Sequence, residues 1–437
     1  MRPAIRPRAA LAITFVVAGL APAGCAARSN IDVPATAQAA ACAPLRVTSV
    51  TPDFGFGNLF QNYGDQNLLG LHWTGGDGTW SARLPDGQTL WNMGDTFIGL
   101  VHPPDAAHPA WWRQPPQTPG SQSWFIRNSG LIQLSPAQGG LITSTLYRIS
   151  PGGSVWSWLA EPGPRLRYGP GAAIAEPAAP GSSRQVLRLF NVVISDRNRS
   201  RYPFGFDVGS VVVTYDLTDF SRPRSIVSLP AGPGRDPAHQ VFFGSGVLTA
   251  DGFTYVFGGT ANDTQMSAYL ARYRTGAGGD PSAWQYWDGG GWASDIDVAA
   301  PILPYRVGRT GVSPGYSVVR QGSTYVLFTV AGQHGSDIGP IVSYWACAPT
   351  GPWHGPYAVY QPPQTAGGGV TGNMLAYNIH VHPEWTTGTG LLLSYDINDA
   401  LPSATAAVIE ADVNLYRPQF VRVKLGPVRR KAPHARS

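Results

Sequence analysis

The sequence predicts an all-β fold, a five-bladed β-propeller that forms a single domain. The 437 residues include 53 Gly and 40 Pro, whereas charged residues make up 13%, a composition typical of many turns and short strands. We find no convincing amphipathic helix after residue 26, and therefore expect none. A unit made of a hairpin and further strands recurs five times, and such a unit repeated around an axis makes a propeller.

Each predicted blade starts with a small or polar entry, a strand, a Gly-containing turn and a second strand. The five hairpins follow Trp73, Gly171, Gly244, Ser313 and Tyr377. We expect third strands at 211–215, 268–273, 341–347 and 407–413, and outer strands at 224–229, 284–287, 355–360 and 420–425. The first strand of each blade lines the central channel, so loops before first strands and after second strands share one mouth.

The hairpin between Trp73 and Ile98 carries two carboxylates, Asp77 and Asp95. Alternation at 79–84 and 89–93 predicts two strands, and the turn Pro85-Asp86-Gly87 joins them. The turn centre near Asp86 places Asp77 opposite Asp95, where paired Cβ atoms lie roughly 4.5–5.5 Å apart. Two carboxylates this close cannot both ionise freely, so one retains its proton to higher pH. This arrangement is typical of an acid with a carboxylate partner, although both residues could instead cap turns.

The two ends of the chain are predicted to lie outside the propeller. Arginines precede an apolar run at residues 9–20, and small residues follow it, which indicates an export signal over residues 1–25. Cys25 resembles a lipoprotein cleavage site, so either lipidation at Cys25 or simple cleavage nearby is expected. A linker at 26–43, the propeller at 44–425 and a basic tail at 426–437 complete the predicted organisation.

Cysteine and charge patterns exclude several classes of function. Cys42 and Cys347 form an even pair, and in an oxidising compartment they predict a disulfide rather than a metal site. Nine of the 31 basic residues lie in the signal and the segment after Phe420, so the body, which holds all 26 acidic residues, is mildly acidic. Nucleic-acid binding is therefore not expected. Nucleotide and acyl-transfer motifs are absent from the sequence, and we expect a monomer without a cofactor.

Further polar and aromatic residues are predicted near the mouth. Some could bind a sugar through hydrogen bonds and others through stacking, but each is also a common turn or core residue. The candidate ligands of the substrate are Asn128, Trp111, Trp112, Asn378, His380 and Asp396. A third tryptophan, Trp124, ends the Pro-rich loop that carries Trp111 and Trp112. His382 is interpreted as a structural residue between blades, and no third ligand completes a zinc site with the two histidines.

Several segments resemble a known protein family. WTGGDGTWSARLPDGQTLWNMGDTFIG, FIRNSG, GPW at 351–353, YNIHVHPE and YRPQFVRV are similar to an actinobacterial five-bladed propeller family of unknown function. That family is similar to the endo-D-arabinanases, which cut D-arabinofuranose polymers of mycobacterial-type cell walls. The resemblance covers residues 45–425, and it implies that Asp77 and Asp95 are a catalytic pair.

Together these observations predict an exported glycoside hydrolase that acts on a polysaccharide, with a furanoside such as D-arabinan as the expected substrate. The residues alone assign neither the acid nor its partner. A non-catalytic glycan-binding propeller of the cell envelope is the leading alternative, because the same mouth could bind sugar while both carboxylates only accept hydrogen bonds. A structural envelope protein that uses the Pro-rich loop as a partner surface is a third possibility.

Overall fold

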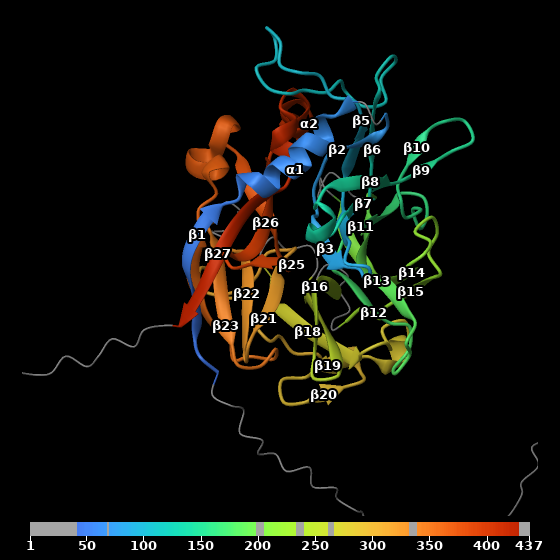
Figure 1. Ribbon diagram of the computed structural model, residues 1–437. Helices are drawn as coiled ribbons and strands as arrows, with labels where there is room; N and C mark the ends of the chain where they lie inside the picture. The colour runs from blue at the N-terminus through green and yellow to red at the C-terminus, as the bar shows by residue number, and fades with distance from the viewer. Residues whose placement is uncertain are drawn as a thin grey trace, which may run out of the picture. The chain divides into compact units, whose positions relative to one another are not determined.

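The protein is described by a computed structural model over residues 42–427, except 68–69, 198–204, 233–239, 261–265 and 332–338. The predicted export signal with Cys25, most of the linker and nearly all of the basic tail lie outside these residues. Five sheets of four or five strands form the blades of a five-bladed β-propeller, as predicted (Figure 1). The inner strands contact one another in sequence, and the last contacts the first, which closes the ring.

The first three blades use consecutive stretches of the chain. Blade 1 contains β3 (Trp80–Arg83), β4 (Thr89–Met93), β7 (Ser129–Gln133) and β8 (Ile142–Leu146). Blade 2 contains β12 (Ala173–Pro177), β13 (Gln185–Ser195), β14 (Phe206–Asp216) and β15 (Ser225–Ser228), and β11 (Leu166–Gly169) pairs with the far half of β13. Blade 3 contains β16 (Val241–Ala250), β17 (Phe253–Thr260), β18 (Ala268–Arg274), β19 (Gln285–Trp287) and β20 (Trp292–Ala293).

The last blade joins the two ends of the described chain. Blade 4 contains β21 (Ser317–Gln321), β22 (Thr324–Val330), β23 (Ile341–Ala346) and β24 (His354–Tyr360). Blade 5 contains β25 (Met374–Thr387), β26 (Gly390–Asp399), β27 (Gln419–Pro427) and, as its outer strand, β1 (Leu45–Pro52). The prediction that 420–425 forms the outer strand is therefore wrong. This segment is the third strand, and β1 pairs with it from Leu45 opposite Pro427 to Pro52 opposite Val421.

A small sheet extends blade 1 beyond the mouth of the propeller. It contains β2 (His72–Gly76), β5 (Thr96–Gly99) and β6 (Ser123–Ile126), and a two-stranded ribbon of β9 (Arg148–Ile149) and β10 (Val155–Trp156) follows blade 1 in the chain. In Figure 1 this extension and both α-helices lie at the upper end of the molecule. Short 3₁₀ helices occupy connections at η2 (Pro136–Gln138), η4 (Pro281–Ala283), η5 (Ile296–Val298), η6 (Pro363–Thr371) and η7 (Val413–Tyr416).

Two α-helices contradict the expectation that the chain has none. The helix α1 (Phe54–Asp65) begins at Asp53, whose carboxylate accepts a hydrogen bond from the Phe56 N–H at 2.9 Å. Its buried face packs on the aromatic core between blades 5 and 1. The helix α2 (Pro402–Ala411) replaces the third strand predicted at 407–413, because Pro at the first turn and the four Ala of this segment favour a helix. Neither helix in the described residues is long and apolar enough to cross a membrane.

The hydrophobic core lies mainly in layers between neighbouring blades. Buried residues of neighbouring blades belong to shared clusters, such as Leu90 and Leu187 for blades 1 and 2, Phe190 and Phe243 for blades 2 and 3, Phe257 and Leu327 for blades 3 and 4, and Phe328 and Leu393 for blades 4 and 5. Trp91 and Phe420 pack together between blades 1 and 5. Each blade thus buries both of its faces, while the strand ends at the mouth remain available to a site.

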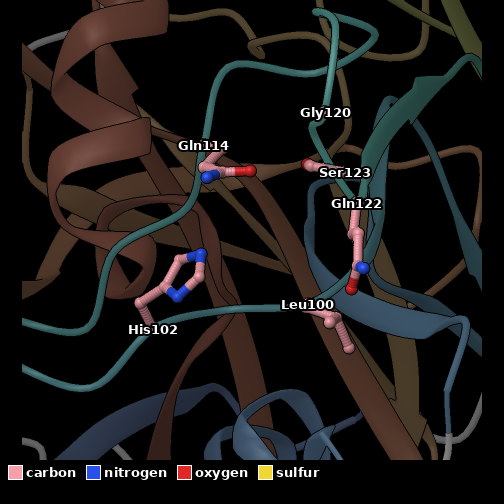
Figure 2. A pocket seen from close by; sticks show the side chains of 6 residues that line it. All are labelled: Leu100, His102, Gln114, Gly120, Gln122 and Ser123. Atoms are coloured by element: carbon pink, nitrogen blue, oxygen red, sulfur yellow. The ribbon is translucent and has the colours of Figure 1, made fainter.

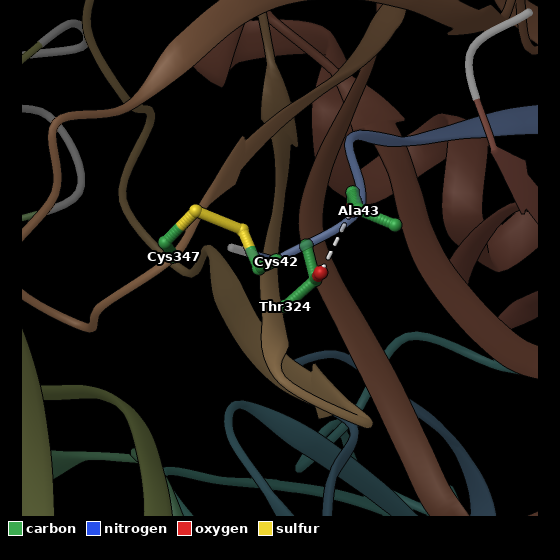
Figure 3. Close-up of a disulfide and its surroundings, with 4 residues drawn as sticks. All are labelled: Cys42, Ala43, Thr324 and Cys347. Atoms are coloured by element: carbon green, nitrogen blue, oxygen red, sulfur yellow. Dashed lines mark hydrogen bonds between the residues drawn. A yellow bond between two sulfur atoms is a disulfide. The ribbon is translucent and has the colours of Figure 1, made fainter. Parts of the chain in front are cut away.

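A disulfide fastens the start of the described chain to blade 4. Cys42 and Cys347 are bonded, as the even pair predicted, with their Cα atoms 5.4 Å apart (Figure 3). Beside the disulfide, Thr324 donates a hydrogen bond to the Ala43 carbonyl at 2.8 Å. The strand β1, which completes blade 5, is thereby attached at its beginning to the neighbouring blade.

Replacing both Cys42 and Cys347 by Ala should lower the free energy of unfolding by about 2–4 kcal/mol. The reason is that the cross-link restricts an unfolded loop of 305 residues and fixes the strand that closes the ring. Urea unfolding without reductant measures the difference, and reductant should destabilise only the wild type. Equal midpoints for both proteins without reductant would contradict this role.

Candidate active site

The β3–β4 hairpin places Asp77 directly opposite Asp95. Trp80 pairs with Asn92, and the same register continues to Arg83 opposite Thr89, as predicted from the turn at Asp86. Beyond the blade, the Asp77 N–H donates to the Asp95 carbonyl at 3.4 Å, and the Gly94 N–H donates to the Asp77 carbonyl at 2.6 Å. The two carboxylates therefore flank the point where the hairpin leaves blade 1 and continues as β2 and β5.

Two glycines allow this close approach of the two chains. A Cβ on Gly94 would lie 2.5 Å from Asp77 Oδ1, which leaves no room for a side chain. Gly78 has a φ of +96°, and a Cβ there would lie 2.8 Å from the Gly94 nitrogen. The Asp-Gly and Gly-Asp pairs of the hairpin are thus required by the geometry of the site.

Asp77 is held in its protonated form by its surroundings. Tyr377 donates a hydrogen bond to Asp77 Oδ2 at 2.9 Å, and the Tyr416 hydroxyl is a second hydrogen-bond partner. Burial above all, and then the negative charges of Asp95 and Asp396, raise the pKa of Asp77 to about 8, and the two tyrosines only partly oppose the rise. At neutral pH this carboxyl group is a proton donor.

Asp95 is paired with two arginines, one between β6 and β7 and one on β11. Arg127 Nη1 lies 3.2 Å from Asp95 Oδ2, and Arg167 Nη1 lies 3.9 Å from Asp95 Oδ1. Burial alone would lower the pKa of Arg167, but Asp95 and Asp196 raise it above its ordinary value. Asp95 is thus bonded to guanidinium groups, whereas Asp77 is bonded to tyrosine hydroxyl groups. The two opposed carboxyl groups therefore lie in different electrostatic surroundings.

Asp396 holds the backbone around Asp77 and has little contact with solvent. It is 2% exposed and accepts hydrogen bonds from the Gly78 N–H at 2.7 Å, Thr79 Oγ1 at 2.9 Å and Asn378 Nδ2 at 3.0 Å. Burial raises the pKa of Asp396, and these three donors oppose the rise by favouring its ionised form. Asp396 and Asn378 were predicted to bind substrate, but the structure uses them to position the start of the first strand.

The histidines of blade 5 lie in the interior. His380, predicted to bind substrate, is 2% exposed and its ring packs against Trp80 in a tilted arrangement with centroids 4.0 Å apart. His382 lies between Ser81 at 2.6 Å and Ser394 at 2.9 Å, which agrees with its interpretation as a structural residue. Burial lowers the pKa of His382 to about 3, so the ring stays neutral.

Three other predicted ligands also have structural contacts. Asn128 is buried, and its side-chain amide bonds both the N–H and the carbonyl of Leu159, so it fixes a loop. The Trp112 ring is stacked between His102 and His108, with centroids 4.4 and 4.1 Å away. Trp111 is half-buried, and its carbonyl accepts a hydrogen bond from Val413. None of these three side chains contacts Asp77 or Asp95 in the described residues.

The Pro-rich loop encloses a small hollow of its own. The cavity has a volume of about 220 Å³. Figure 2 shows His102 and Gln114 on one side and Gln122 on the other. Because His102 also stacks on Trp112, this loop is organised around its own contacts rather than as a wall facing the carboxylates.

Sequence reasoning missed the residues that set the charges of the two carboxylates. Arg127 precedes β7, Arg167 lies on β11, and Tyr416 ends η7. Arg127 and Tyr416 stand within the segments FIRNSG and YRPQFVRV, so the signal was present there. No spacing rule connects these residues to Asp77 or Asp95, since they reach the site from separate parts of the chain. The described residues hold no cluster of three or more His, Cys, Asp or Glu arranged to bind a metal ion.

Asp77→Asn should be less sensitive to alkaline pH than the wild type. The pKa of Asp77 is about 8 in the folded protein against 3.8 ordinarily. Between these values the folded state holds a proton that the unfolded state releases, so wild-type stability falls as pH rises. Thermal unfolding at pH 5 and pH 9 should show the variant gaining several degrees relative to the wild type at pH 9.

Asp95→Asn is the matched control for this measurement. It removes the carboxylate partner of Arg127 and one of the two carboxylate partners of Arg167, so we expect a lower melting temperature at both pH values. Parallel pH dependence of the wild type and Asp77→Asn would show that Asp77 is not protonated in the folded protein.

Comparisons with known proteins agree with the fold. No curated protein matches the sequence. A putative hydrolase from Bacteroides ovatus ATCC 8483 is similar in structure, with a TM-score of 0.61 and 19% identity over 86% of this chain and 90% of that one. Weaker similarity, with a TM-score of 0.42 and 11% identity over 81% of this chain and 91% of that one, is found to the α-L-arabinofuranosidase PaAbf62A of Podospora anserina, solved with cellotriose.

A family model matches residues 58–425, which include nearly the whole propeller and the site. The chain therefore belongs to the family described as "Domain of unknown function (DUF5005)".

Proposed function

We propose that this protein is an exported glycoside hydrolase in which Asp77 is the acid and Asp95 is its ionised partner. One observation carries the proposal: two opposed carboxyl groups lie in different electrostatic surroundings. Asp77 keeps a proton beside two tyrosines and Asp396, while Asp95 is paired with two arginines. Glycoside hydrolases require such an acid and such a carboxylate.

In the proposed reaction Asp77 gives its proton to the glycosidic oxygen as the bond to the anomeric carbon breaks. Cross-strand opposition supports a carboxyl separation of about 5–5.5 Å, the spacing of retaining enzymes. Asp95 then attacks the anomeric carbon and forms a covalent glycosyl ester. Asp77, now ionised, removes a proton from water as the water cleaves the ester, which restores both groups.

The substrate is proposed to be a furanosidic polysaccharide of the D-arabinan type. Support comes from the resemblance of the Asp77–Asp95 hairpin to that of endo-D-arabinanases. The disulfide is in keeping with export to an oxidising compartment. We propose that the protein acts outside the cytoplasm, either free or attached to the envelope through a lipid on Cys25. A non-catalytic glycan-binding protein would have no need of a protonated Asp77.

Asp77→Asn and Asp95→Asn should each lower the hydrolysis of arabinogalactan by about 10²–10⁴-fold, since each removes a group that acts on the reacting bond. Released oligosaccharides measure the rate, and NMR of the first product should show retained anomeric configuration. Arabinogalactan binding without any release by the wild type would contradict the proposal, and inversion would contradict the role of Asp95 as nucleophile.

The rate should also fall as pH rises through the pKa of Asp77, about 8, because the acid is then ionised. Asp396→Asn removes one of the negative charges that raise this pKa, so the alkaline limb of kcat/KM should move to lower pH. Asp86→Asn is the matched control, since Asp86 lies exposed at the opposite end of the same hairpin. An alkaline limb that does not move in Asp396→Asn would contradict the coupling of Asp396 to Asp77.

A further inference from the structure

A groove lies beside Asp95 and is not part of the two-carboxylate site. It has a volume of about 820 Å³, near the upper end of the range for ligand sites. The segment before β6, the β6–β7 region and the segment around β10 form its walls. Lining residues that matter here are Gln117, Thr118, Trp124, Arg127, Trp156 and Glu161.

Trp156 gives this groove an exposed aromatic surface. It is 54% exposed, whereas its neighbours Val155 and Ser157 are buried at 6% and 5%. Alternation along β10 therefore directs the indole outwards from a fixed backbone. A large exposed aromatic ring beside polar side chains is typical of a binding groove, and such rings stack on the C–H faces of sugars.

The charge of the groove suits a neutral ligand. Its lining contains one cation, Arg127, and one anion, Glu161, and the remaining polar groups that line it are hydroxyls and amides. Arg127 is already paired with Asp95. A polyanion would find no excess positive charge there, whereas the hydroxyl groups of a neutral glycan could bond to the amides and hydroxyls.

Arg127 makes the groove continuous with the carboxylate site. Its side chain lines the groove and also bonds Asp95 Oδ2 at 3.2 Å. The backbone N–H of Arg127 donates a hydrogen bond to Ser157 Oγ at 3.1 Å, and Ser157 directly follows Trp156 in the chain. The aromatic surface is thus held in a defined position relative to Asp95.

We infer that this groove binds several consecutive sugar residues of a neutral polysaccharide on one side of the bond that is cut, with Trp156 as a stacking platform. The inference rests on the proposed hydrolase function and deepens it. Trp156 contacts bound sugar far from the reacting bond, so it affects affinity for long substrates rather than the chemical step.

The test compares wild type, Trp156→Ala and Tyr305→Ala on D-arabinofuranosyl oligosaccharides of increasing length prepared from arabinogalactan. Tyr305 is the control, an aromatic residue 38% exposed that does not line the groove. Trp156→Ala should lower kcat/KM about tenfold on the longest substrates through KM and leave the shortest unchanged. Tyr305→Ala should match the wild type at every length.

The outcomes separate the groove from the proposed function. If kcat/KM of Trp156→Ala is unchanged at every substrate length, or falls equally on short and long substrates, the groove does not bind the substrate as inferred. The proposed hydrolase function is unaffected by either result. If the wild type releases no product, the proposed function fails. Electrophoresis in gels containing arabinogalactan then tests whether the groove binds the polysaccharide. Weaker retardation of Trp156→Ala than of the wild type supports binding in the groove, and equal retardation overturns it.

Discussion

The pairing of the β3–β4 hairpin is the constraint on which the site depends. The turn at Asp86 sets a register that puts Asp77 opposite Asp95, and the two chains remain in contact where the blade ends. That contact is possible because Gly94 has no side chain to collide with the Asp77 carboxylate. Backbone geometry thereby places the two carboxyl groups opposite each other, where two negative charges would repel.

The rest of the site resolves this conflict by giving the two carboxyl groups different surroundings. Arg127 and Arg167 form ion pairs with Asp95, whereas Asp77 accepts hydrogen bonds from two tyrosine hydroxyl groups and lies near a second acid, Asp396. The proton therefore resides on Asp77. Keeping a protonated carboxyl group at neutral pH lowers the stability of the fold. The core between the blades and the closure of the ring by β1 offset that loss.

Local patterns allowed much of the fold to be predicted. Hairpins such as β21–β22 combine alternating strands with a Gly turn, and their spacing identifies five blades. The helix α1 was missed because Gly55 and Gly57 weaken its helical pattern, and packing against Trp91 and Phe420 stabilises it instead. The pairing of β1 with β27 joins distant parts of the chain, which no local pattern records.

The candidate site, like the fold, was predictable only where a local pattern relates its residues. Asp77 and Asp95 were predictable because one turn relates them, whereas Arg167 and Tyr416 approach from other elements. The predicted ligands Asn128 and Asn378 illustrate a different limit of sequence-based prediction. A polar residue near a mouth is equally able to bond its own loop, and in both cases a buried protein partner takes the side-chain amide.

The most direct test is a ¹³C NMR titration of the aspartate side-chain carboxyl carbons in the wild type and in Asp77→Asn. Our account predicts one carboxyl signal that titrates near pH 8 in the wild type and is missing from the variant. If every aspartate in the folded wild type titrates below pH 5, Asp77 is not a proton donor at neutral pH, and the proposed division of roles between Asp77 and Asp95 is wrong.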